Sequence, residues 1–412
     1  MRRLLAFVLA ASAAAACSDP PPPPPPPPPT QLSIRVVDAT NDSAIAGAEV
    51  TILQLGQTLV TDASGAILID PIDPGSYTYR AQAAGYVLEP RARHDLKSTT
   101  VEKEKTTMLT IALDPRPNTT AGGTIEGNVT AAGAPVEGAL VVATSLRAFV
   151  AYSDKAGHYR ILGAEAPNLY SVTAFIQGYS STTVNSVDLA VSDTKTADLT
   201  LTAGAGATVG GRLIGGTGTS SVVIAHKETR YTIPGLVAKG TLGGNYSISG
   251  VPPGTYEIYS GLEEDGVSFD AESLVDLSGY HLGPTVNVVG TSSESVDLRY
   301  AAAILGVAPT DTSTVVAPPT FTWPSVQEAN RYLVEVRNVL GQVIYGGFDQ
   351  QGRPINPIQA PATMLRYDGA QPLARGAFYS WRVYALKPVT TGALFEIVSA
   401  SEELGGEFRV AR

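Results

Sequence analysis

Apolar and polar residues alternate along most of the chain after residue 30. Residues 32–37, 50–53 and 76–80 each place apolar side chains at every second position. A period of two is the spacing of a β-strand with one buried face, and Gly, Pro and Asp residues that favour tight turns separate the runs. Almost no stretch carries the spacing of an amphipathic helix. The pattern therefore predicts an all-β protein built of β-sandwiches.

A set of turn residues and tyrosines recurs along the first 300 residues. The glycines Gly65, Gly157 and Gly244 mark the same turn in three copies, and their separation fits one small sandwich per copy rather than a solenoid repeat. The copies read T-D-A-S-G at 61–65, P-G-S-Y at 74–77 and G-Y at 85–86; S-D-K-A-G at 153–157, N-L-Y at 168–170 and G-Y at 178–179; and G-G-N-Y at 243–246 and P-P-G-T-Y at 252–256.

This pattern resembles the carboxypeptidase regulatory-like domain, a transthyretin-like (prealbumin-like) sandwich of seven strands. The resemblance covers residues 31–115 and 122–202, and a more divergent copy at 205–300. It implies three tandem seven-stranded sandwiches. The domain accompanies zinc carboxypeptidases in some proteins, but this sequence carries no counterpart of their catalytic domain.

The remaining segment, residues 304–412, has a different pattern. P-P-T-F-T-W at 318–323 leads into an alternating run at 331–336, and L-A-R-G-A-F-Y-S-W-R-V follows at 373–383. These residues resemble a fibronectin type III domain, an immunoglobulin-like sandwich. The resemblance implies that Trp323 fills the core between two sheets and that Tyr379 begins the sixth strand.

The first 30 residues have a composition of their own. Arg2 and Arg3 precede a short apolar run, small residues follow up to Ala16, and Cys17 stands before an unbroken proline run at 20–29. These are the parts of a secretory signal. The segment resembles a bacterial lipoprotein signal, which implies a signal peptide at residues 1–16 and a lipidated Cys17. An ordinary signal peptide that leaves Cys17 as a free thiol is the alternative.

Residues 17–30 then form the anchor and a disordered proline-rich linker. Polyproline II rises ~3.1 Å per residue, so the run would hold the folded part roughly 30 Å from the membrane. Ser18 rather than Asp follows the cysteine, which resembles the pattern for outer-membrane sorting. We therefore expect an exported protein, lipid-anchored in the outer membrane, at the cell surface or on the periplasmic face.

Charge and chemistry narrow the function classes. The net charge of −10 and the absence of a basic run argue against a nucleic-acid partner. The four histidines form no metal-binding pair, and the S-D-T-K string at 192–195 lacks the companion motifs of a serine hydrolase. We therefore expect no catalytic residue, no metal, no cofactor and no enzyme activity.

Two sets of residues stay as candidates for binding. Asp62 and Asp154 precede equivalent glycines, so each belongs to a calcium loop or to an Asx turn; one carboxylate per turn supplies few of the 6–8 oxygens that calcium requires. A group of tyrosines crowds the divergent third copy, as candidate ligand-binding aromatics or as core residues. The group comprises Tyr231, Tyr246, Tyr256 and Tyr259.

The function that fits these features is non-catalytic. We expect a lipid-anchored envelope protein that acts in binding, adhesion or scaffolding, with the membrane as a partner through the anchor and a polysaccharide or an envelope protein as the other. Exposed sheet edges could also accept a partner strand. The alternative is an accessory subunit of a surface hydrolase or of an envelope transport system.

Overall fold

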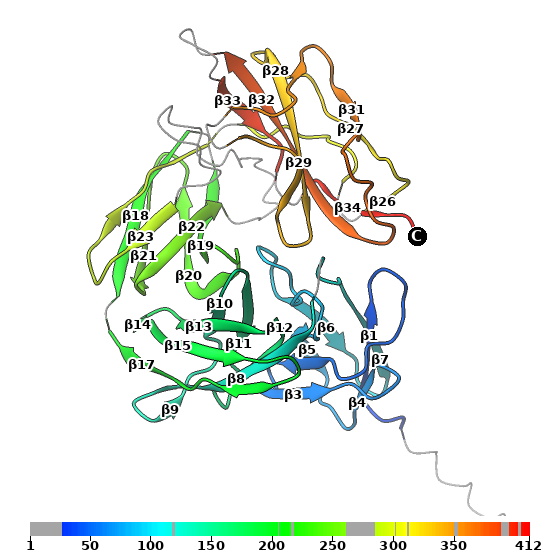
Figure 1. Cartoon of the computed structure of the whole chain (residues 1–412), viewed down its shortest axis with the longest axis vertical. Coiled ribbons are helices and arrows are strands. Elements are labelled where there is room, and N and C mark those ends of the chain that lie inside the picture. The colour runs from blue at the N-terminus through cyan, green and yellow to red at the C-terminus, as the bar shows by residue number, and fades with distance from the viewer. Residues whose placement is uncertain are drawn as a thin grey trace, which may run out of the picture.

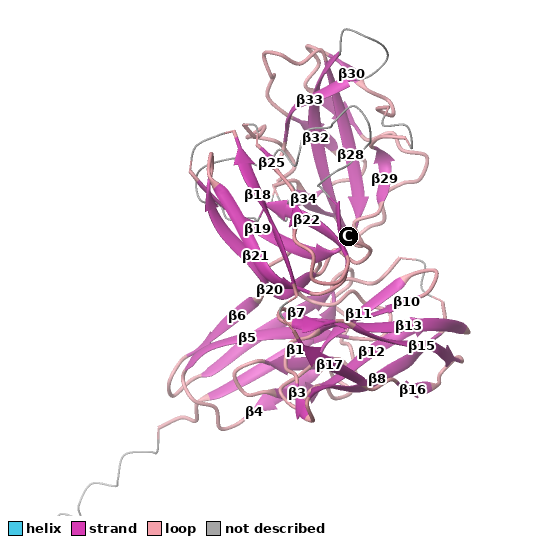
Figure 2. Ribbon diagram, turned by 90° about the vertical axis from the view of Figure 1, so that its left-hand side faces the viewer, coloured by secondary structure: helices cyan, strands magenta, loops and turns pink. Residues whose placement is uncertain are grey.

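The computed structural model describes residues 27–117, 120–204, 206–215, 218–260, 285–300, 302–310, 313–349, 353–388, 395–402 and 405–412. Throughout these ranges the regular structure is β-strand, which confirms the all-β prediction. The described part of the chain accordingly holds no helix able to cross a membrane. In both overall views the first two groups of strands lie at one end of the molecule and the last group at the other (Figures 1 and 2).

The first sandwich has two sheets, with strand orders β4-β1-β7 and β3-β2-β5-β6. β1 pairs antiparallel with β4 and parallel with β7. Its alternating residues Leu32, Ile34 and Val36 are fully buried, because every second side chain of a strand faces the opposite sheet. The strands are β1 (Gln31–Asp38), β2 (Glu49–Ile52), β3 (Gln57–Val60), β4 (Ala66–Ile69), β5 (Gly75–Gln82), β6 (Lys97–Val101) and β7 (Thr106–Leu113).

The second sandwich repeats this arrangement. Its sheets have the orders β11-β10-β13-β15 and β12-β8-β17-β14, and β9 and β16 also pair with β8. β8 lies between antiparallel β12 and the parallel strands β16 and β17. The strands are β8 (Gly122–Ala131), β9 (Ala134–Pro135), β10 (Leu140–Thr144), β11 (Ala148–Tyr152), β12 (His158–Glu165), β13 (Asn168–Phe175), β14 (Tyr179–Ser180), β15 (Thr182–Leu189), β16 (Thr194–Thr196) and β17 (Leu199–Ala203).

The third sandwich has the same strand connectivity despite its divergent sequence. Its sheets have the orders β21-β18-β24, with β25 also on β18, and β20-β19-β22-β23. β18 pairs antiparallel with β21 and parallel with β24 and β25. The strands are β18 (Ala207–Ile214), β19 (Thr219–His226), β20 (Thr232–Thr241), β21 (Asn245–Val251), β22 (Gly254–Ser260), β23 (Thr285–Val288), β24 (Glu294–Ser295) and β25 (Leu298–Arg299).

The fourth group of strands forms a larger sheet and a small one. The larger has the order β26-β34-β32-β28-β29, with β30 on β28 and β33 on β32, and β27 pairs with β31. Trp323 is 4% exposed and packs on Tyr332 and Trp381, and the hydroxyl of Tyr379 accepts the Ala374 N–H at 2.9 Å. The strands are β26 (Ser313–Val315), β27 (Thr320–Thr322), β28 (Arg331–Asn338), β29 (Val343–Gly346), β30 (Ile358–Gln359), β31 (Met364–Arg366), β32 (Phe378–Pro388), β33 (Phe395–Ala400) and β34 (Glu407–Val410).

Successive sandwiches dock through the repeated Gly-Tyr turn. A Cβ added at Gly163, where β12 bulges, would lie 3.0 Å from the Gly85 nitrogen of the first sandwich. A Cβ at Gly250 in β21 would lie 2.9 Å from the Gly178 nitrogen of the second sandwich, and Gly178 donates its N–H to the Gly250 carbonyl at 2.8 Å. Gly85 and Gly178 occupy the same place in the repeat. The same kind of close backbone contact therefore joins the first sandwich to the second and the second to the third.

The hydrophobic cores also cross these boundaries. The core of the third sandwich includes Leu88 from the first sandwich and Leu140, Val142 and Phe175 from the second. Phe175 stacks edge-on against Tyr256 at 6.2 Å between ring centroids. Side chains of two sandwiches therefore complete the interior of a third.

Candidate functional site

The segment at residues 87–96, between β5 and β6, lies where the sandwiches meet. We call it the junction segment. Glu89 exchanges both backbone hydrogen bonds with Ala81 of β5, at 2.8 and 2.9 Å, and the Val87 N–H donates to the Asp114 carbonyl at 2.8 Å. Leu88 enters the core of the third sandwich. The backbone of the segment is thus fixed to the first sandwich while its side chains reach the others.

Arg91 of the junction segment joins the first sandwich to the fourth. Its Nη1 lies 3.0 Å from Oδ2 of Asp114, its Nη2 lies 3.4 Å from Oε2 of Glu407, and its guanidinium carbon lies 3.7 Å from the centre of the Phe378 ring. Both acids are almost fully buried. A buried carboxylate is costly unless it is paired and hydrogen-bonded, so this arginine holds both acids in place.

Each of the two acids has a second basic partner. Oδ1 of Asp114 lies 2.7 Å from Nη1 of Arg409, and Oε1 of Glu407 lies 2.7 Å from Nε2 of His94. Arg409 also donates to the Gly376 carbonyl at 2.8 Å. The fourth group of strands is therefore attached to the junction by charges that are shielded from solvent.

Arg93 joins the junction segment to the third sandwich. Its Nη2 contacts Oε1 of Glu257, and its guanidinium carbon lies 4.5 Å from the centre of the Tyr259 ring. Nε of Arg230 lies 3.6 Å from the other oxygen of Glu257. Arg93 adopts a φ of +66°, a conformation that few non-glycine residues take. The surrounding contacts hold it there.

Two tyrosines link three sandwiches beside the junction segment. Tyr231 donates its hydroxyl to the Leu88 carbonyl at 3.1 Å, and Tyr152 donates to the Thr232 carbonyl at 3.0 Å. Their rings meet edge to face at 6.5 Å. Burial raises the pKa of both hydroxyls, so both stay protonated and able to donate at neutral pH.

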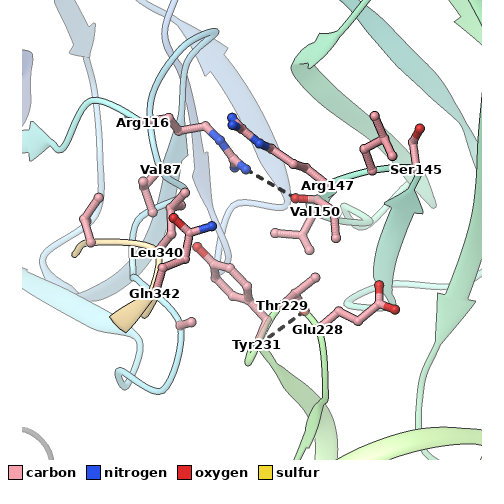
Figure 3. Close-up of a pocket in the computed structure, with 14 residues that line it drawn as sticks. Val87, Arg116, Ser145, Arg147, Val150, Glu228, Thr229, Tyr231, Leu340 and Gln342 are labelled. Atoms are coloured by element: carbon pink, nitrogen blue, oxygen red, sulfur yellow. Dashed lines mark hydrogen bonds between the residues drawn. The ribbon is translucent and has the colours of Figure 1, made fainter. Parts of the chain in front are cut away.

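A cavity of about 390 Å³ opens at this junction, and we call it the junction cavity. Figure 3 shows that its lining comes from all four groups of strands. Arg116 donates to the Ala148 carbonyl at 3.3 Å and lies over the Phe149 ring at 4.3 Å, and burial lowers its pKa. The labelled lining residues are Val87, Arg116, Ser145, Arg147, Val150, Glu228, Thr229, Tyr231, Leu340 and Gln342.

The chemistry of the junction cavity suits the binding of a polar ligand. Its wall carries the half-buried guanidinium of Arg116, the amide of Gln342 and the carboxylate of Glu228, together with apolar patches at Val87 and Leu340. The volume lies within the ~300–1,000 Å³ of ordinary ligand sites. The wall holds hydrogen-bond donors and acceptors, among them the hydroxyls of Ser145 and Thr229.

The four candidate tyrosines of the third sandwich all lie in its interior. Tyr231 is 9% exposed, Tyr246 and Tyr259 are 4% exposed, and Tyr256 is fully buried. Tyr246 and Tyr256 donate their hydroxyls to the carbonyls of Val296 and Pro252, at 2.8 and 2.7 Å. Rings this buried offer no stacking platform for a glycan. Tyr246 and Tyr256 pack in the core of the third sandwich. Tyr231 and Tyr259 also border cavities between the sandwiches.

The two candidate aspartates cap their own turns. Oδ1 of Asp62 accepts the N–H groups of Ser64 and Ala66 at 2.8 and 2.9 Å, and Oδ1 of Asp154 accepts those of Ala156 and His158 at 2.9 Å. This is the geometry of an Asx turn. Across the described ranges, no three His, Cys, Asp or Glu side chains gather to hold a metal ion.

Cys17 and the proline run up to residue 26 lie outside the described residues. The junction segment is the functional feature that sequence reasoning missed. Its signal was the basic cluster of Arg91, Arg93 and His94, which is unusual in a chain with only 16% charged residues. A basic cluster in a loop is usually solvated, and nothing local distinguishes this one.

The family comparison agrees with the shared strand order of the first two sandwiches. The model of the carboxypeptidase regulatory-like domain matches residues 31–114 and 124–202. Both segments carry this domain's signature. Together they make up less than half of the chain. No curated protein matches the chain.

Several solved structures share limited similarity with the chain. The Bacillus anthracis TIE protein is 13% identical over 66% of this chain and 50% of its own, with a TM-score of 0.19. The Streptococcal ancillary pilin and BcpA, the major pilin subunit of Bacillus cereus, are each 12% identical over 66% of this chain and 98% of their own, with TM-scores of 0.20 and 0.19. The chain thus spans half the length of the TIE protein. TM-scores this low do not establish a common arrangement of domains.

Proposed function

We propose that this protein is a non-catalytic binding or scaffolding module of the cell envelope, anchored by lipid at Cys17. The observation that carries the proposal is the junction: buried ion pairs and shared cores hold the sandwiches in one arrangement and leave a cavity lined by all four groups of strands. A binding surface assembled from several units needs such rigid support. Its partner is a polysaccharide or an envelope protein.

The N-terminal residues support the envelope location. A basic start, a short apolar run and Cys17 before the prolines fit export and lipid attachment. One acyl chain gives only marginal membrane binding, whereas several on one cysteine anchor durably. The proline run would then hold the junction cavity away from the bilayer.

The location is tested by comparing the wild-type protein with Cys17→Ala. Membranes are fractionated, and intact cells are treated with protease. We expect the wild type in the outer-membrane fraction and the variant released. Degradation by external protease would place the protein at the surface, and protection would place it in the periplasm. An unchanged distribution of the variant would refute the lipid anchor.

Binding is tested with the purified protein against envelope polysaccharides and whole cells, beside Arg116→Gln. This substitution removes the half-buried charge of Arg116 from the junction cavity and keeps a hydrogen-bond donor. We expect the wild type to bind and Arg116→Gln to bind at least about tenfold more weakly. If the protein binds neither but co-purifies with one hydrolase or transporter, the role is that of an accessory subunit.

A further inference from the structure

A second cavity lies on the other side of the junction segment. It measures about 460 Å³ and is bounded by the first three sandwiches. We call it the arginine–tyrosine pocket. Arg80 of β5 enters it from the first sandwich, Tyr152 from the second, and Tyr231 and Val237 from the third. It is separate from the junction cavity of Figure 3, although Tyr231 borders both.

Arg80 is the basic residue of this pocket that forms no ion pair. Its guanidinium carbon lies 4.0 Å above the centre of the Tyr152 ring, and within the described residues no carboxylate lies at ion-pair distance and no acceptor takes its N–H groups. Burial lowers its pKa, yet a guanidinium stays charged at any physiological pH. A partly buried cation therefore faces the pocket with its hydrogen-bond donors unused.

The other basic residues of the pocket are already paired with acids. Arg91 and His94 contact Glu407, and Arg93 contacts Glu257. Asp95 is the one acid that lines the pocket, and it forms no ion pair with Arg80. The positive charge available to a ligand is therefore that of Arg80, on which Glu137 acts electrostatically without forming an ion pair.

The rest of the wall is apolar. Leu96 and Val237, which line the pocket, are 43% and 53% exposed, and Ile233 and Leu236 continue the apolar wall. Arginine binds a carboxylate through two parallel hydrogen bonds, and apolar walls bury the body of a ligand. The complement of this pocket is a carboxylate on an apolar body.

We propose that the arginine–tyrosine pocket binds a monocarboxylate carried on an apolar body, with Arg80 holding the carboxylate against the face of Tyr152. Such a group occurs on a free amphiphilic acid and at the C-terminus of a chain that ends in an apolar residue. The inference rests on the proposed binding function and names a ligand class for it.

The test is calorimetric titration of the purified protein with 4-phenylbutyrate and decanoate, each beside its neutral amide. A blocked glycyl-glycyl-phenylalanine peptide, as free acid and as amide, forms the second arm. We expect the acids to bind at least about tenfold more tightly than the amides. Tighter binding of the peptide acid would identify a chain terminus as the source, and tighter binding of decanoate would identify a free acid.

Variants of Arg80 separate charge recognition from packing. Arg80→Gln should weaken acid binding at least about tenfold and leave amide binding unchanged. Arg80→Lys keeps the charge but lacks the planar fork, so it should bind the acids more tightly than Arg80→Gln and more weakly than the wild type. Arg35→Gln, at an exposed arginine of β1 in the same sandwich that lines neither cavity, is the matched control and should bind as the wild type does. Thermal unfolding of each variant shows whether loss of the Tyr152 contact has loosened the fold.

Equal binding of acids and amides, no binding at millimolar concentration, or full acid binding by folded Arg80→Gln would overturn the proposal. An equal loss of acid binding in Arg80→Lys and Arg80→Gln would also overturn it. The fractionation of Cys17→Ala and the binding assay with Arg116→Gln test the proposed function independently of this titration. A negative titration therefore rejects the ligand class and does not reject the proposed function.

Discussion

At the scale of single residues, glycine fixes how one sandwich meets the next. Gly163 and Gly250 have φ values of +67° and +73°, and each also lies against the backbone of the preceding sandwich. A β-carbon would strain the conformation and press on a neighbour that has no side chain to move. The contact between successive sandwiches therefore requires glycine, which has no β-carbon, at these two positions.

Replacing Gly163 with Ala should lower the free energy of unfolding by more than the ~1–2 kcal/mol that a left-handed conformation alone costs an alanine. Gly133→Ala is the matched control, because Gly133 has a φ of +80° and nothing within 4 Å of the added carbon. Urea unfolding of both variants checks this. Equal losses would mean that the Gly85 contact contributes nothing.

The pH dependence of stability should carry the signature of His226. Burial lowers its pKa to about 4, whereas an unfolded histidine titrates near 6.5. Between these pH values, His226 is protonated in the unfolded chain and neutral in the folded chain. The contribution of neutral His226 to the free energy of unfolding is fully present above about pH 6.5 and is lost as the pH falls toward 4.

The loss should amount to about 3 kcal/mol at pH 4. His226→Gln, which keeps a polar group beside Thr229, should remove this part of the pH dependence. Urea midpoints at pH 7, 5.5 and 4.5 measure the difference between wild type and variant. Parallel curves over this range would contradict the assignment to His226.

At the scale of elements, the junction segment is one loop that contacts both the third sandwich and the fourth group of strands. Arg91→Met should destabilise the protein by about 3 kcal/mol, because it leaves two buried acids with one basic partner each. Lys105→Met removes an exposed partner of Glu102 and should leave the urea midpoint close to that of the wild type. Similar urea midpoints for the two variants would show that the Arg91 contacts carry no net stability.

The strands were predictable and the junction was not, for a physical reason. Alternation in residues such as Leu32, Ile34 and Val36 is local and states directly which face is buried. The contact between Arg91 and Glu407 joins positions far apart in the chain. The sequence around either residue gives no information about its partner. The tyrosines of the third sandwich posed the same problem, since a tyrosine at position 256 looks alike whether its ring faces solvent or a core.

At the scale of the whole molecule, the sandwiches are not independent. The third one takes Leu88 and Phe175 from its neighbours, so residues 205–300 alone would expose the apolar surface that these side chains cover. We expect this fragment to bind the dye 8-anilinonaphthalene-1-sulfonate strongly and residues 31–300 to bind little. Weak dye binding by the fragment, with dispersed amide resonances, would show that it folds unaided.

The parallel pairing of the first and last strands would have a consequence if the proposed lipid anchor tethers the protein at one end. In each of the first three sandwiches, the strand that enters lies alongside strands that lead out, with both running the same way. Tension between the membrane and a captured partner would pull these strands past each other along their axes. Their hydrogen bonds would then be loaded together rather than opened one after another. We therefore expect each of these sandwiches to resist a pulling force applied along the chain.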